Sequence, residues 1–123
     1  MTTSRIVMAA QRSALRKRLL AYALALPEAY IDHPWGEDVA KVGKKVFVFF
    51  GTGRGDFGMG VKLPESGPLA LAQPGVTPSG YGLAASGWVN INFGETSMPF
   101  EMLRDWIVES YRAIAPKRIA KLL

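Results

Sequence analysis

The stretch Gly87-Trp88-Val89-Asn90-Ile91-Asn92-Phe93 alternates apolar and polar side chains with a period of two. Such alternation predicts a β-strand whose odd-numbered residues point into a core, while Trp88, Asn90 and Asn92 point to the other side. A tryptophan between two amides fills a core poorly. We therefore expect the second side of this strand to be a contact surface.

Three further segments, 38–42, 45–50 and 57–63, have the composition of strands, and the dipeptide Gly43-Lys44 is typical of a tight turn between the first two. Together with 81–83 and 88–93 they predict a sheet of about five strands. In 45–50, alternation places Phe47 and Phe49 on the side away from the core. Residues 59, 61 and 63 are expected to face the core, and Gly58, Gly60 and Lys62 the other side.

Helical patterns flank these strands. Residues 4–26 predict a helix that ends at Pro27, and residues 99–115 predict a second helix that ends at Pro116. Residues 66–73 predict a short helix. Helix, strands and helix in this order indicate an α+β fold, with an antiparallel sheet carrying the terminal helices on one face. The length of 123 residues fits a single domain, 1–123.

Composition excludes several classes of function. The chain has no cysteine, so disulfides, thiolate zinc sites and cysteine nucleophiles are excluded, and a reducing cytoplasm is the expected location. Its longest apolar run, 19–26, is too short to cross a membrane, and residues 1–11 do not resemble a secretion signal. The net charge of +5 is concentrated at the two ends of the chain, which suits an anionic partner.

The strongest functional pattern combines aromatic and basic side chains on the predicted outward side of the sheet. Aromatic rings stack on bases and ammonium groups contact phosphates, so this pattern predicts nucleic-acid binding, to DNA or RNA. Basic residues near the hairpin ends are expected to contact phosphates without sequence preference. The candidate residues are Lys41, Lys44, Lys45, Phe47, Phe49, Arg54, Lys62, Trp88, Asn90 and Asn92.

Other readings stay open. Loop residues 74–86 or a second subunit would turn the same aromatics into ordinary packing, and the Trp88 surface would serve a protein partner or a homodimer equally well. A small-molecule or metal site under the glycine-rich loop 51–60 is a third hypothesis. We expect no cofactor and no metal site, because His33 is the only histidine and lies beside Pro34, in a turn.

Enzymatic motifs are weak. Gly53-x-Gly55-x-x-Gly58 matches a dinucleotide fingerprint, but the next segment is a strand ending at Pro64, so no helix N-terminus awaits a pyrophosphate. No nucleophile elbow is present, and one histidine in a turn is a poor general base. Ser110 and Tyr111 are adjacent on a helix, so one should pack and the other should bond to the backbone. We expect a non-enzymatic protein.

Several motifs in the same order resemble the MmcQ/YjbR family of small bacterial proteins. They span about residues 15 to 118 and comprise Leu26-Pro27, Asp32-His33-Pro34-Trp35-Gly36, the aromatic strand from Val42 to Phe50, Val61-Lys62-Leu63, Gly87-Trp88-Val89 and Glu109-Ser110-Tyr111. The resemblance implies a frataxin-like (CyaY-like) fold with a curved antiparallel sheet. It also implies DNA binding through two basic hairpin wings, and a tryptophan surface of the kind that frataxin-like sheets present to protein partners.

Overall fold

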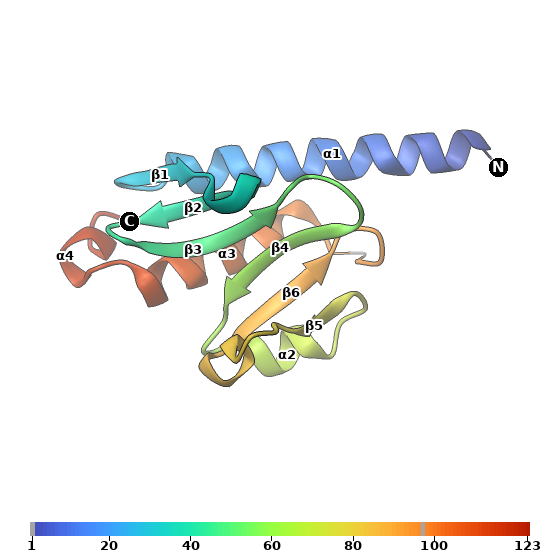
Figure 1. Ribbon diagram of the computed structural model, residues 1–123. Helices are drawn as coiled ribbons and strands as arrows, with labels where there is room; N and C mark the ends of the chain where they lie inside the picture. The colour runs from blue at the N-terminus through green and yellow to red at the C-terminus, as the bar shows by residue number, and fades with distance from the viewer. Residues whose placement is uncertain (1, 97) are drawn as a thin grey trace.

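A computed structural model of the chain describes residues 2–96 and 98–123, with side chains described from Ala9 onward. Six strands form one antiparallel sheet in the order β1-β2-β3-β4-β6-β5 (Figure 1). The strands are β1 (Ala29–Asp32), β2 (Asp38–Val42), β3 (Lys45–Gly51), β4 (Phe57–Lys62), β5 (Val76–Pro78) and β6 (Trp88–Asn92). The helices are α1 (Thr2–Ala25), α2 (Gly67–Leu71), α3 (Phe100–Ile114) and α4 (Lys117–Ala120), with short 3₁₀ turns η1 (Pro34–Gly36) and η2 (Leu83–Ser86).

The long helices α1 and α3 pack against each other and on one face of the sheet (Figure 1). Their apolar side chains meet those of the central strands in a single core, which includes Leu19, Phe50, Ile91 and Ile107. Full burial of an aliphatic or aromatic side chain contributes about 1.5–3 kcal/mol, so this layer supplies most of the drive to fold. The predicted α+β fold, with terminal helices on one face of an antiparallel sheet, is confirmed. None of the helices in the described ranges is both long and apolar enough to span a bilayer.

The two edge strands differ from the prediction. β1 and β5 lie outside the segments predicted as strands, and β5 ends in Pro78. An edge strand tolerates proline, because one side of its backbone needs no partner in the sheet. The predicted strand at 81–83 is wrong, since Tyr81 has a left-handed φ of 57° and begins a turn. The sheet therefore has six strands rather than about five.

A β-bulge decides the orientation of Phe47. Lys41 pairs with Val46 and Ala40 with Val48, so Phe47 is an extra residue in β3 with no partner on β2. Its side chain turns to the helix side, is fully buried, and packs edge to face on the ring of Tyr111 with centroids 5.2 Å apart. The prediction that Phe47 lies on the outward side is wrong, because strict alternation does not survive a bulge.

A second irregularity of the sheet turns Gly58 to the core side. The pairing of β4 with β6 shifts register between Phe57 and Met59, which places Gly58 against the ring of Phe93 on the core side. The outward orientation expected for Gly58 is therefore wrong. Met59, Val61 and Leu63 are buried in the core as predicted.

Three successive residues of α3 fasten it to distant segments. The Glu109 carboxylate accepts hydrogen bonds from the backbone amides of Glu65 and Ser66 at the start of α2, each 3.0 Å long. The Ser110 hydroxyl bonds to the backbone of β3 and β4, and Tyr111 packs in the core while its hydroxyl donates to the Pro27 carbonyl at 2.6 Å. The expected division of roles between Ser110 and Tyr111 is confirmed. These three side chains tie α3 to β3, β4 and the segments at Pro27 and Ser66.

Candidate nucleic-acid interface

Five exposed cations gather at one end of the molecule. The turn at Gly43 lies against Pro116, since a Cβ built on Gly43 would sit 3.7 Å from the proline ring. This contact sets the tip of the β2–β3 hairpin beside α4 (Figure 1). We call the group the basic end: Lys44, Lys45, Lys117, Arg118 and Lys121.

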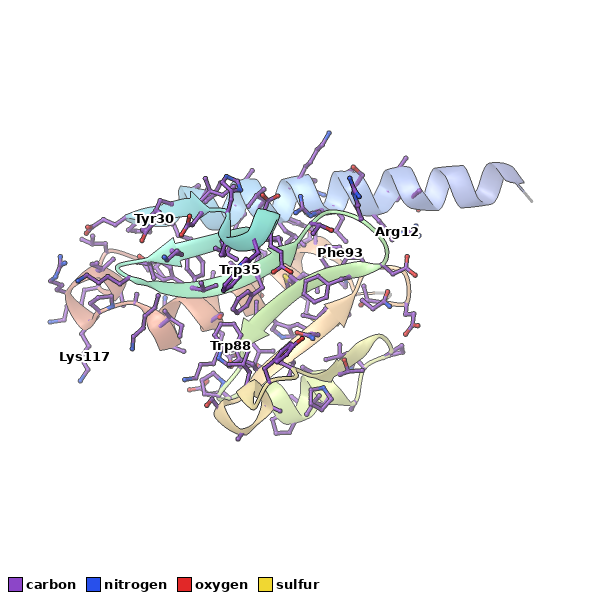
Figure 2. All side chains as sticks on the ribbon, in the orientation of Figure 1. Arg12, Tyr30, Trp35, Trp88, Phe93 and Lys117 are labelled. Carbon is purple, nitrogen blue, oxygen red and sulfur yellow. The ribbon has the colours of Figure 1, made fainter. Side chains whose placement is uncertain are left out.

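The basic end carries little compensating negative charge. Arg118 approaches Glu28 at 3.9 Å, and both side chains are largely exposed, so this ion pair contributes little. Within the described ranges the four lysines form no ion pair. Figure 2 shows Lys117 extending from α4 away from the body of the protein. Four ammonium groups are thus available to a polyanion.

The sheet face opposite α1 and α3, the open face, carries two of the three predicted aromatic residues. Phe49 and Trp88 meet there edge to face, with ring centroids 5.3 Å apart. Gly60 lies beside Phe49 without a side chain, which makes room for this contact. Trp88 is only 7% exposed, however, and Phe49 is half-buried. The pair consequently offers ring edges rather than a broad stacking platform.

The two lysines of the open face have different surroundings. Lys41 bonds the Asp32 carboxylate at 3.2 Å and lies 5.9 Å from the centroid of the Tyr30 ring, so its charge is largely neutralised. The backbone amide of His33 donates to Asp32, and this bond together with Lys41 lowers the pKa of that carboxyl. Lys62 pairs with Trp88 across β4 and β6 and forms no ion pair in the described part of the chain.

A hollow of about 350 Å³ lies on the open face between the β3–β4 and β5–β6 loops. We call it the sheet groove. Phe49 and Phe57 form its apolar surface, and Arg54 and Tyr81 reach it from the two loops. Asn90 also lines it, and its side-chain oxygen accepts a 2.8 Å hydrogen bond from Ser79. The groove thus brings together three of the predicted residues, Phe49, Arg54 and Asn90, from β3, the β3–β4 loop and β6.

Two exposed aromatic residues were missed as candidates. Trp35 is 96% exposed and Tyr81 is fully exposed, and both have left-handed backbone angles that are rare for bulky residues. In Figure 2, Trp35 and Trp88 lie on the viewer's side of the sheet, and α3 lies behind the sheet. The signal was in the sequence, because Pro34 and Gly36 flank the tryptophan and Gly80 and Gly82 flank the tyrosine. Such neighbours predict tight turns that hold a side chain outward.

The His33 ring contacts a carboxylate of β2. Its Nδ1 lies 2.9 Å from Asp38, and the other oxygen of Asp38 accepts a 2.7 Å bond from Arg16. The bond from Arg16, followed by its charge and the contact with His33, lowers the pKa of Asp38. Across residues 2–96 and 98–123, no cluster of three histidine or carboxylate side chains could hold a metal ion.

Comparison with known proteins identifies the family. The YjbR family model matches residues 24–113, which is well over half of the chain and includes every strand and nearly all of α3. No curated protein matches, and neither does any solved structure. The frataxin-like fold and the DNA-binding wings implied by the resemblance therefore stay predictions. On the extent of the family match, the chain belongs to the YjbR family.

Proposed function

We propose that this protein is a non-enzymatic, cytoplasmic nucleic-acid-binding protein that contacts the phosphate backbone of DNA through the basic end. The observation that carries the proposal is the contact of Gly43 with Pro116, which joins two basic segments that are distant in sequence into one cationic surface. Surfaces of this kind bind phosphates by releasing counterions and do not read bases.

The number of cations bounds the affinity. Each neutralised phosphate adds about −0.9 to the slope of log K against log salt, so five contacts give a slope of about −4.5. Lysine-rich contacts without base readout bind with dissociation constants on the order of 10⁻⁴ to 10⁻⁶ M at physiological salt. Binding is therefore weak, steeply dependent on salt, and nearly the same for different sequences.

Fluorescence anisotropy with two labelled duplexes of unrelated sequence, measured between 50 and 200 mM salt, tests the proposal. Lys44→Gln, Lys45→Gln and Lys117→Gln should each weaken both complexes alike and reduce the slope by roughly one. Lys17→Gln is the matched control, because Lys17 is exposed on α1 next to the β3–β4 loop, at the other end of β3. Absence of binding at 50 mM salt, or binding that is insensitive to salt, would refute the proposal.

A protein-interaction surface or homodimer interface at Trp88 is supported less well. The indole is 7% exposed in the monomer, so a partner would contact mainly its edge. The two aromatic side chains that the described structure exposes most are Trp35 and Tyr81, and the hypothesis included neither. Light scattering tests the homodimer. A dimer built on the open face would give the wild type the mass of two chains, and Trp35→Ala should lower that mass.

A further inference from the structure

We propose that the sheet groove binds a nucleotide, with the base against the aromatic surface and the phosphate at Arg54. The site shares no residue with the basic end, so the inference does not depend on the proposed duplex contact. Its volume of about 350 Å³ is near the lower end of the range of about 300–1,000 Å³ for small-molecule sites. Such a space admits one nucleotide and excludes a duplex.

The apolar part of the groove suits a planar ring. Phe49 and Phe57 present their side chains from adjacent strands, and Tyr81 stands at the rim with its whole ring in solvent. A base in the groove would contact the two phenyl groups and reach the tyrosine ring at the rim. Base–aromatic stacking contributes about 1–3 kcal/mol per base and does not depend on which base is present.

The polar groups of the groove suit the rest of a nucleotide. The Asn90 oxygen already accepts from Ser79, which fixes the amide and leaves its two N–H donors for the edge of a base. Arg54 is exposed and makes no ion pair with any described residue, so its guanidinium can bind a phosphate in bidentate fashion. Glu37 also lines the groove, and a carboxylate there suits the hydroxyls of a ribose.

This combination of groups selects against simpler ligands. A phosphate ion alone would meet one arginine and would be repelled by Glu37. A purely apolar ligand would cover the half-buried Asn90 amide and leave its N–H donors without partners, which is unfavourable. A planar heteroaromatic base joined to a phosphate satisfies all of these groups together.

NMR titration of the ¹⁵N-labelled protein with AMP, at low salt, tests the site. Amide shifts are expected at Phe49, Arg54, Asn90 and in residues 79–83, and none at the basic end. Arg54→Gln should weaken AMP binding about tenfold, as loss of a charge-assisted pair predicts, and should leave adenosine binding unchanged. Tyr81→Ala should weaken AMP and adenosine alike, by roughly five- to a hundredfold.

Matched measurements separate this site from the proposed function. Lys44→Gln should keep the AMP shifts and weaken duplex binding, while Arg54→Gln should weaken AMP binding and keep the duplex affinity. A parallel titration with single-stranded oligo(dA) shows whether the groove binds a free nucleotide or an unpaired base within a strand. Amide shifts in the groove with either ligand support the site. Shifts with neither ligand, shifts confined to the basic end, or equal AMP affinity in Arg54→Gln would overturn it.

Discussion

The hydroxyl of Ser110 on α3 donates a buried hydrogen bond to the carbonyl oxygen of Phe47 on β3, 2.6 Å away. The same hydroxyl accepts a bond from the amide of Lys62 on β4 at 2.9 Å. Continuing the register in which Val48 faces Val61 would set Phe47 opposite Lys62. The helix thus inserts a side chain where a direct bond between strands would otherwise form, next to the bulge that turns Phe47 into the core.

Ser110→Ala should lower the free energy of unfolding by about 1–3 kcal/mol, because it leaves the Phe47 carbonyl and the Lys62 amide without a partner in a buried place. Urea denaturation followed by circular dichroism measures the change. Ser86→Ala is the control, since Ser86 is exposed in η2 and makes no side-chain hydrogen bond in the described structure. Equal midpoints for the two variants would show that the bridge is dispensable.

This bridge also explains where prediction from sequence stops. Period-two alternation placed Val89, Ile91 and Trp88 on their correct sides, because β6 pairs regularly with β4 over these residues. The same rule failed at Phe47 and Gly58, where a bulge adds one residue to a strand. Next to the bulge at Phe47, backbone groups of β3 and β4 bond to a helix side chain and not to each other. The periodicity of one segment does not contain that information.

The candidate site was also predictable only in part. Lys44 and Lys45 were predictable as hairpin cations, because a Gly-Lys turn between two strands exposes its neighbours. Their proximity to Lys117 was not, since it depends on the path of α3 across the sheet and on the turn at Pro116. Likewise, the glycine-flanked turn at Tyr81 could be predicted locally, whereas its place in the same groove as Phe49 is a tertiary relationship.

Gly58→Ala should destabilise the protein by about 1–3 kcal/mol or more. A Cβ at this position would overlap the ring of Phe93, and a buried ring in a packed core has little freedom to move. Thermal unfolding, read by far-ultraviolet circular dichroism, measures the loss. A melting temperature equal to that of the wild type would mean that Gly58 does not face the core.

Gly80→Ala is the matched control for this substitution. A Cβ on Gly80 meets no atom within 4 Å, and its φ is outside the left-handed region. Replacement there restricts the unfolded chain and should leave stability unchanged or raise it by up to about 1 kcal/mol. The contrast between the two glycines separates steric conflict from the general effect of losing a glycine.

Trp35→Phe should remove most of the tryptophan fluorescence that acrylamide can quench. Trp35 is 96% exposed, whereas Trp88 and Trp106 are each 7% exposed, so one indole dominates the accessible emission. Stern–Volmer plots of wild type, Trp35→Phe and Trp88→Phe measure the accessible fraction. A large quenchable fraction that remains in Trp35→Phe and disappears in Trp88→Phe would show that the open face exposes Trp88 after all.

Asp38→Asn should lower stability at neutral pH by about 1 kcal/mol and should lose this effect in acid. The bond from Arg16 lowers the pKa of the folded Asp38 below its unfolded value of about 3.9, so the carboxylate stabilises the folded state fully above that value. The stabilisation is lost as pH falls through the folded pKa, when the proton displaces the ion pair. A charge-assisted bond contributes about 1.5–3 kcal/mol, and the 25% exposure of Asp38 reduces this figure.

Urea unfolding of wild type and Asp38→Asn at pH 7, 5, 4, 3 and 2.5 tracks the difference between them. The two should differ most at pH 5 and above and should converge as the pH falls toward 2.5, because protonation of the wild-type carboxyl makes it increasingly resemble the amide. Asp105→Asn serves as control, since its 3.4 Å pair with Arg104 is mostly exposed and should contribute little at any pH. A deficit in Asp38→Asn that stays constant down to pH 2.5 would mean that the side chain stabilises the fold through its shape and not its charge.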